Sequence, residues 1–468
     1  MVGNYHERPL TFRADDINSI IRMVRAGKSC ILVGVDGIGK TSLMRHLVSP
    51  TVREHYLGED KKHFNFLPLN ANELTRPSAL AYYGHMALLL EPILSGYQLL
   101  SSLDKNPLAI TNEEVAKQLL FERVESILSL CERRRFVFVF DAFDVAFTET
   151  EPQFFRVLHA LRIHAGGRVC YVAASKNVPS LICDMQSQKV VREMFPELFN
   201  GNIYGIKPLK EQDASVVIEQ GLAKHGRRYS ASLRHFLFAL TGAHPGMLAA
   251  VVATWNDGMD ALVERDQVSQ VIHQLLQELT VVSQCEQVWY SLSEIEQHCM
   301  KRVPRGLFVK NPDLPPYSPR QIQEALHALV LKGILREGYQ NRKIYQCFSP
   351  LFAAYVTQQF SSGSPGLQLD LSRQQVWIDG TLCANHLTPK EFLLLRFLAE
   401  HAGEVCSREE TTRAVYGEAY DSRSDDARLD ALVERARKSI GDDSRPPRFL
   451  ETVRGAGHRL KEYLGEPF

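Results

Sequence analysis

Short apolar runs alternate with longer amphipathic segments over the first two hundred residues. The runs at 31–33, 64–69, 136–140 and 169–173 are rich in Val, Ile, Leu and Phe. Strands that are covered on both faces of a parallel sheet have this character, and the longer segments between them have helical periodicity. The pattern predicts an α/β domain with a parallel sheet over residues 1–205.

Strand signals fade after this region, and helical periodicity dominates. Residues 206–278 predict an all-helical lid. Residues 279–360 predict a winged helix, in which Ser318-Pro319 begins a helix and the apolar runs at 333–335 and 344–348 form the wing.

A Ser-, Gly- and Pro-rich segment at 361–366 predicts a linker to a last domain at 367–468. This domain opens with short alternating strands and ends in a hairpin. Three helices lie between them, two of which begin with capping boxes at 388–391 and 407–410, while the third runs to about Ile440. The fold class is therefore multidomain α/β plus α.

Composition limits the range of functions. The chain of 468 residues has 54 basic and 54 acidic residues, so any DNA-binding surface must be local. Nine cysteines without a C-x-x-C pair suit a reducing cytoplasm, and no apolar stretch is long enough for a membrane span. We expect a cytoplasmic protein without a membrane partner.

The segment from Gly34 to Thr41 fits the phosphate-binding pattern G-x-x-x-x-G-K-[ST] between an apolar strand and a helix. Its backbone N–H groups and the helix N-terminus would face phosphate oxygens, with Lys40 on the β- and γ-phosphates and Thr41 on Mg²⁺. The alternative is a plain Gly-rich turn. The predicted nucleotide-binding residues here are Gly34, Gly37, Gly39, Lys40, Thr41 and Ser42.

A partner carboxylate for Mg²⁺ is available at Asp141, which ends the apolar run at 136–140. If this strand lies beside the strand before the phosphate loop, Asp141 would act on Mg²⁺ through water, together with Thr41. The alternative is an acid that only caps a buried strand. We predict an ATP or ADP site with Mg²⁺.

The segment Asp141-Ala142-Phe143-Asp144 resembles the acidic motif of NACHT-like members of the STAND class, signal-transduction ATPases related to AAA+ proteins. The resemblance implies that Ala142 replaces the usual catalytic Glu and that Asp144 orients water. Because Val145 stands where the family has a further acid, the resemblance implies a slow, switch-like ATPase.

Further positions extend this resemblance in the family's order. Lys176 occupies a position similar to sensor 1, where STAND proteins often have Arg. Pro208 resembles the proline near the adenine, and Pro245 resembles the lid proline that contacts nucleotide. Phe12–Asp16 sits where the family covers the base. The implied device is a hinge, in which the nucleotide touches both sheet domain and lid.

The last domain resembles the OmpR-type effector domain of response regulators. The blocks that carry this likeness are 376–380, 387–395, 403–410 and 451–460. The family places its third helix in the major groove and its wing in the minor groove. The implied DNA contacts are Arg428, Arg435, Arg437 and Lys438 on the helix and Arg454 on the wing.

The charge balance of the last domain does not decide whether its partner is DNA or protein. Residues 366–468 contain 15 Lys and Arg against 18 Asp and Glu, and Asp430 and Glu434 alternate with the basic residues of the third helix. One interpretation is a nucleotide-switched transcription regulator whose duplex-DNA binding gains avidity from homo-oligomerisation. A second is a STAND sensor or scaffold in stress or defence signalling, whose winged helix binds protein. A third, an origin-recognition-like initiator, does not explain the OmpR-type domain.

Overall fold

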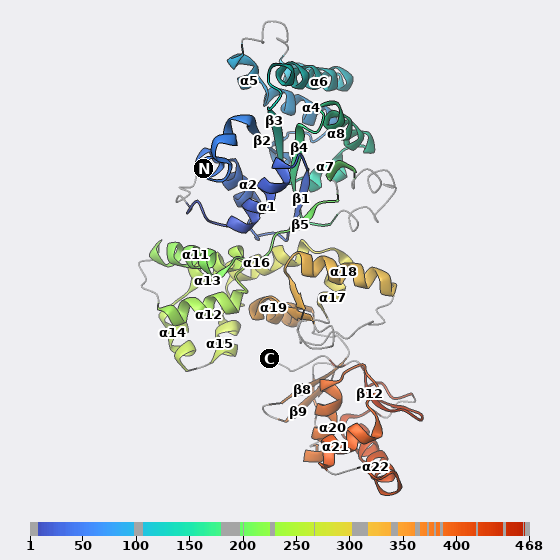
Figure 1. The fold of residues 1–468 in the computed structure, drawn as a ribbon. Helices are drawn as coiled ribbons and strands as arrows, with labels where there is room; N and C mark the ends of the chain where they lie inside the picture. Colours follow the sequence, from blue (N-terminus) through green and yellow to red (C-terminus); the bar gives the residue numbers. More distant parts are fainter. Residues whose placement is uncertain are drawn as a thin grey trace. The chain divides into compact units, whose positions relative to one another are not determined.

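The computed structural model is drawn as a ribbon in Figure 1, and the chain divides into two compact units. The structure describes residues 8–97, 106–178, 197–199, 201–224, 230–265, 267–301, 317–337, 345–360, 366–371, 374–378, 381–383, 387–417, 420–442, 446–461 and 463. The first unit comprises residues 1–257, 277–293 and 327–334, and the second comprises 258–276, 294–326 and 335–468.

A five-stranded parallel sheet forms the centre of the first unit, with the strand order β2-β3-β4-β1-β5. The strands are β1 (Cys30–Val33), β2 (Phe64–Asn70), β3 (Arg135–Asp141), β4 (Val169–Ser175) and β5 (Ile203–Gly205). The sheet confirms the predicted α/β class. Strand β3, which ends in Asp141, does not lie directly beside β1, because β4 pairs with both and separates them. Local apolar patterns do not specify which strands pair.

Alternate residues of the strands face opposite sides of the sheet. Ile31 and Val33 belong to a large apolar core with Phe138, Phe140 and Tyr171. That core also takes in buried residues of helices that include α4 (Ala79–Leu88), α6 (Glu113–Leu130), α7 (Asp144–Glu149) and α8 (Pro152–His164). Since strand side chains alternate, Cys30 and Leu32 face the other side.

The remaining helices of the first unit carry the N-terminal element, the phosphate loop and the lid. The N-terminal and sheet-domain helices are α1 (Ala14–Arg25), α2 (Lys40–Val48), α3 (Pro50–Leu57) and α5 (Glu91–Gly96). The lid helices are α11 (Glu211–Lys224), α12 (Ala231–Thr241) and α13 (Pro245–Thr254), and α16 (Leu279–Tyr290) packs with α13.

The second unit contains the last domain and part of the segment 279–360, because residues 279–293 and 327–334 of that segment belong to the first unit. Strands β6 (Leu335–Glu337) and β7 (Tyr345–Cys347) pair antiparallel, as predicted for the first wing. The helices before the last domain are α14 (Asp257–Glu264), α15 (Val268–Leu275), α17 (Glu294–Met300), α18 (Pro319–Leu331) and α19 (Pro350–Phe360). The end of α18 belongs to the first unit. Most of the predicted linker, residues 361–365, lies outside the described residues.

The C-terminal domain consists of an antiparallel sheet, three helices and a hairpin. Its strands are β8 (Leu367–Asp370), β9 (Gln375–Ile378), β10 (Thr381–Leu382), β11 (Leu450–Val453) and β12 (Gly457–Leu460). Its helices are α20 (Pro389–Glu400), α21 (Arg408–Tyr416) and α22 (Ser422–Ile440). Both predicted capping boxes are present, Thr388 with Glu391 and Ser407 with Glu410.

Across the ranges that the structure describes, no helix combines the length and apolar character that a bilayer span requires.

Candidate nucleotide-binding site

The phosphate loop connects β1 to the first turn of α2. Gly37 and Gly39 have φ values of 76° and 94°, in the left-handed region that glycine adopts without strain. At Gly34, a Cβ would lie 2.9 Å from Cγ2 of Ile38. The glycines are therefore required by the curl of the loop. Thr41 and Ser42 follow in the first turn of α2, where Thr41 is exposed.

Lys40 folds back onto the loop that precedes it. Its Nζ donates hydrogen bonds to the carbonyl oxygens of Gly34 at 2.7 Å and Val35 at 3.0 Å. Burial lowers the pKa of the Lys40 ammonium, and the nearby carboxylate of Asp36 opposes this shift. The loop thus holds a largely buried cation at the point where the sequence predicts the phosphates.

The acidic loop after β3 is tied to the end of β4. Asp144 Oδ1 accepts hydrogen bonds from Ser175 Oγ and from the backbone N–H of Lys176, both at 2.7 Å. Asp141 Oδ1 accepts the N–H of Ala142. Val145 packs against the sheet core, which explains an apolar residue in place of an acid.

Lys176 reaches the phosphate loop. Its Nζ lies 2.8 Å from Oδ2 of Asp36, and Oδ1 of the same carboxylate lies 3.4 Å from Lys40 Nζ. Lys40 and Lys176, both predicted as site residues, therefore share one anionic partner, which the sequence reasoning did not single out.

The lid contacts this loop through the N-terminus of α13. His244 caps the helix, because its Nδ1 accepts the N–H of Met247, and its Nε2 lies 3.1 Å from the carbonyl oxygen of Asp36. Burial lowers the pKa of His244 to about 3, so the ring is neutral near pH 7 and Nε2 carries the proton. The N–H of Gly246 also donates to the Gly37 carbonyl oxygen at 3.1 Å.

Pro245 and Arg13 flank the loop at Gly39. A Cβ on Gly39 would lie 3.9 Å from Cγ of Pro245 and 3.8 Å from Nη2 of Arg13. The buried guanidinium of Arg13 donates to the carbonyl oxygens of Ile38 and Lys207, and so connects the phosphate loop to the start of the lid.

Pro208 lies in that start of the lid. The N–H of Leu209 donates to the Ala243 carbonyl oxygen, which joins the two lid motifs. A Cβ on Gly333 would lie only 2.6 Å from Cδ of Pro208, so Pro208 packs closely against Gly333. Pro245 thus lies against the phosphate loop, and Pro208 lies against Gly333.

Backbone strain gathers around this loop. Among the described non-glycine residues, positive φ values occur at Arg13, Ala142, Ala243 and Gln374. The first three belong to segments that contact the phosphate loop or carry its predicted acids. Such conformations cost about 1–3 kcal/mol each and gather at functional sites. No sequence pattern reveals them.

Sequence reasoning also missed Gln284 on α16. Its side-chain oxygen would lie 3.1 Å from a Cβ on Gly37 and 2.2 Å from one on Gly246. The close approach of loop, lid and α16 thus depends on two glycines. In the sequence, only the positions of Gly37 in the phosphate loop and of Gly246 after His244-Pro245 indicated this close approach.

The residues present fit a nucleotide with Mg²⁺. The loop supplies glycine-lined backbone and a buried lysine, and Thr41 and Asp141 supply oxygen donors of the kind Mg²⁺ prefers. In the described part of the chain, no group of three or more His, Cys, Asp or Glu side chains could hold a metal alone.

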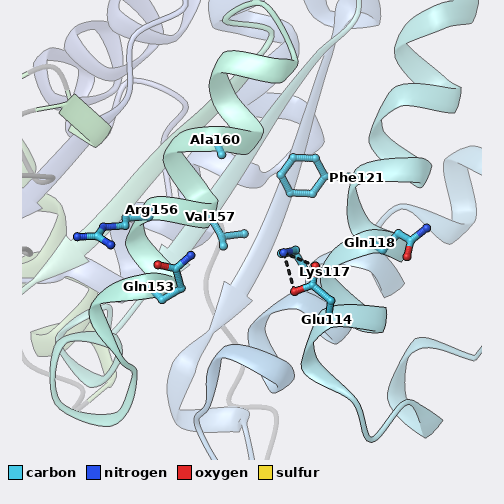
Figure 2. Close-up of a pocket in the computed structure, with 8 residues that line it drawn as sticks. All are labelled: Glu114, Lys117, Gln118, Phe121, Gln153, Arg156, Val157 and Ala160. Carbon is cyan, nitrogen blue, oxygen red and sulfur yellow. Dashed lines mark hydrogen bonds and ion pairs between the residues drawn. The ribbon is translucent and has the colours of Figure 1, made fainter.

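A separate groove of about 550 Å³ runs between α6 and α8 (Figure 2). Phe121 and Val157 form its apolar part, and Lys117 pairs with Glu114 at one side. Neither helix carries a predicted nucleotide-binding residue, so the groove is not part of this site.

The predicted DNA contacts divide into two kinds. Arg428, Arg435 and Lys438 are exposed on α22, and Arg454 is exposed at the tip of the β11–β12 hairpin. Arg437 is instead bound within the domain, because its guanidinium donates to the Leu450 carbonyl oxygen and to Thr452 Oγ1.

Two of the exposed arginines lie near acids. Arg435 Nε lies 3.7 Å from Glu391 Oε1, and Arg428 stacks over the Tyr416 ring near Asp425. Glu434 pairs with Arg437 at 2.7 Å, which reduces the negative charge it presents on this helix.

This fold and loop define a P-loop NTPase with a helical lid and a C-terminal winged-helix domain of the transcription-regulator type. The family model "Novel STAND NTPase 1" matches residues 8–323, and "Transcriptional regulatory protein, C terminal" matches residues 384–460. The chain belongs to the novel STAND NTPase 1 family.

Solved structures show likenesses to each part. The Walker-type ATPase of Pyrococcus abyssi is 12% identical and has a TM-score of 0.43, over 75% of this chain and 99% of that chain. The RstA DNA-binding domain of Klebsiella pneumoniae, solved with the RstA box, is 29% identical over 20% of this chain and 89% of that chain, with a TM-score of 0.19. The DNA-binding domain of CpxR from E. coli is 31% identical over 20% and 88%, with a TM-score of 0.18.

Proposed function

We propose that this protein is an ATP-binding, slowly hydrolysing switch that controls DNA binding by its C-terminal winged helix. The observation that carries the proposal is the double contact between loop and lid, from His244 to the Asp36 carbonyl and from Gly246 to the Gly37 carbonyl. A ligand that differs in affinity for the closed and open lid shifts their populations.

We propose the following roles for the site residues. Lys40 and the loop N–H groups would bind phosphates. Thr41 and Asp141 would hold Mg²⁺. Pro245, the first residue of lid helix α13, would contact the bound nucleotide. Bound Mg²⁺ supplies charge neutralisation at the phosphates. Asp144, fixed by Ser175 and the Lys176 N–H, would orient water. An alanine in the place of the usual catalytic Glu and an apolar Val145 support slow turnover.

Duplex DNA is the proposed partner, contacted by Arg428, Arg435 and Lys438 on α22 and by Arg454 on the hairpin. The membership of residues 384–460 in the transcriptional-regulator family supports this choice. A domain with more acidic than basic residues binds phosphates weakly alone, so we propose nucleotide-dependent homo-oligomers that add avidity. Such a regulator would act in the cytoplasm.

One observation favours a second candidate, a scaffold whose winged helix binds protein. The C-terminal segment has 18 acidic and 15 basic residues, and Arg435 and Arg428 lie near acids. A sensor or scaffold in stress or defence signalling remains the alternative proposal.

Two measurements on the full-length protein test these proposals. Calorimetry with Mg²⁺ and ADP or adenylyl-imidodiphosphate should show heat of association. Duplex-DNA retardation should then depend on nucleotide and weaken with salt. Nucleotide binding without DNA retardation at low salt would favour the scaffold, and no nucleotide binding would reject both.

A further inference from the structure

The carboxylate of Asp36 lies between the two lysines that face the phosphate loop. Its Oδ1 is 3.4 Å from Lys40 Nζ, and its Oδ2 is 2.8 Å from Lys176 Nζ. The side chain of Lys40 is 11% exposed, so the anion stabilises a cation that burial disfavours. In this arrangement both ammonium groups, of Lys40 and Lys176, are therefore paired with the carboxylate of Asp36, a residue of the loop itself.

The two ion pairs differ in what would break them. Lys40 is expected to serve both the β- and γ-phosphates, so either nucleotide would compete for it. We take Lys176, which lies outside the loop just after the end of β4, to serve the last phosphate only. A γ-phosphate would thus have to replace Asp36 on both lysines and would add negative charge beside the carboxylate, whereas ADP could leave the Asp36–Lys176 pair intact.

We propose that Asp36 competes with the γ-phosphate for Lys40 and Lys176 and so lowers the preference of this protein for ATP over ADP. The inference rests on the proposed nucleotide site. It makes Asp36 a specificity-determining residue of the loop, and it makes the form with the lysines on Asp36 the resting form.

The same residue connects this competition to the lid. The Asp36 carbonyl oxygen is the partner of His244 Nε2, and the next carbonyl, of Gly37, is the partner of the Gly246 N–H. A Cβ on Gly37 would lie 2.8 Å from Cε1 of His244, so little space separates loop and lid. A shift of Asp36 towards or away from the lysines would therefore move the contact that closes the lid.

The test compares Mg²⁺-adenylyl-imidodiphosphate with Mg²⁺-ADP by calorimetry on full-length protein. Asp36→Asn keeps the size and the backbone carbonyl but removes the charge. We expect its affinity for the triphosphate analogue to rise about tenfold and its affinity for ADP to change by about threefold or less. Asp60→Asn, an exposed acid paired with Arg25 at the surface, is the matched control and should leave both affinities unchanged.

A second variant gives the opposite sign. Lys176→Gln should lower the affinity for the triphosphate analogue about tenfold and leave the affinity for ADP near the wild-type value. In the double variant the two effects should not add, because they share one ion pair. Thermal melting of each variant checks that the fold is retained.

The outcomes separate this inference from the proposed function. If the wild-type protein binds both nucleotides but Asp36→Asn and Lys176→Gln change the two affinities equally, Asp36 is no discriminator and the nucleotide site stands. If the wild-type protein binds neither nucleotide, the proposed function fails and this inference fails with it.

Discussion

Nε2 of His244 and the carbonyl oxygen of Asp36 lie 3.1 Å apart, although 208 positions separate them in the chain. The contact brings the cap of a lid helix onto the phosphate loop. Protonation would leave the Nε2 donor in place but would remove the Nδ1 acceptor of the Met247 N–H, so the cap of α13 depends on the protonation state of one buried ring. The lid is thus coupled to the loop by direct hydrogen bonds.

This contact predicts a pH dependence of stability. The pKa of His244 falls from its ordinary 6.5 to about 3 in the folded protein, so only the unfolded chain takes up a proton between these values. Its contribution is complete above pH 6.5 and declines as the pH falls towards 3. We expect the free energy of unfolding to drop by about 2 kcal/mol between pH 6.5 and 5.

Urea titrations followed by tryptophan fluorescence measure this change. Trp255 and Trp289 both lie in the first unit, so the signal reports mainly on that unit. His244→Asn keeps a residue that caps helices well but does not titrate there, and its pH dependence should be flatter by this amount. Parallel pH profiles for both proteins would exclude a neutral buried His244.

Lys40→Ala should weaken nucleotide binding by about a hundredfold or more, because it removes the charge-assisted contacts to phosphate. Calorimetry with Mg²⁺-ADP measures the loss. Lys28→Ala, an exposed lysine just before β1, is the control and should bind as the wild type does. Normal affinity in Lys40→Ala would show that the site is assigned wrongly.

Asp144→Ala should retain nucleotide binding and slow hydrolysis, by about 10²–10⁴-fold if Asp144 acts on water. Asp144→Asn offers a sharper comparison, since its amide oxygen can still accept from Ser175 and the Lys176 N–H. We expect both variants to be slow and only the alanine variant to melt earlier. Single-turnover phosphate release measures the rate. If Asp144→Asn turned over at the wild-type rate, the negative charge of Asp144 would not be needed for hydrolysis.

Replacing Arg435, Lys438 or Arg454 by Ala should reduce the affinity for duplex DNA and lower the salt slope by about one unit each. The measurement is gel retardation or fluorescence anisotropy over a range of salt concentrations. Arg396→Ala, on an exposed i,i+4 pair of α20, serves as the control. Unchanged DNA affinity in all three variants would show that other residues contact DNA, or would favour a protein partner.

Arg437→Ala should act differently, by destabilising the C-terminal domain. The guanidinium joins α22 to β11 through the Leu450 carbonyl and Thr452, and its loss should cost about 1–3 kcal/mol. Arg437→Lys should not restore stability, because an ammonium lacks the planar fork. Urea unfolding checks both, and a stable Arg437→Ala protein with weak DNA binding would reverse this assignment.

Local sequence signals predicted much of the architecture. The Thr388 and Ser407 capping boxes, the β6–β7 pair and the loop between β1 and α2 were all predictable, because each depends on residues close together in the chain. The order of strands was not, because apolar runs specify burial but not neighbours. The insertion of β4 between β1 and β3 therefore appears only in the fold.

The site divides in the same way. The sequence by itself determined a glycine-rich loop with Lys40, an acid at a strand end and a C-terminal winged helix, because these follow from residue type at short spacing. Tertiary structure alone decided that Asp36 pairs with Lys176, that His244 of the lid contacts the Asp36 carbonyl oxygen, and that Arg437 is bound within its own domain. Such contacts depend on angles and distances between elements far apart in the chain, which no local pattern encodes.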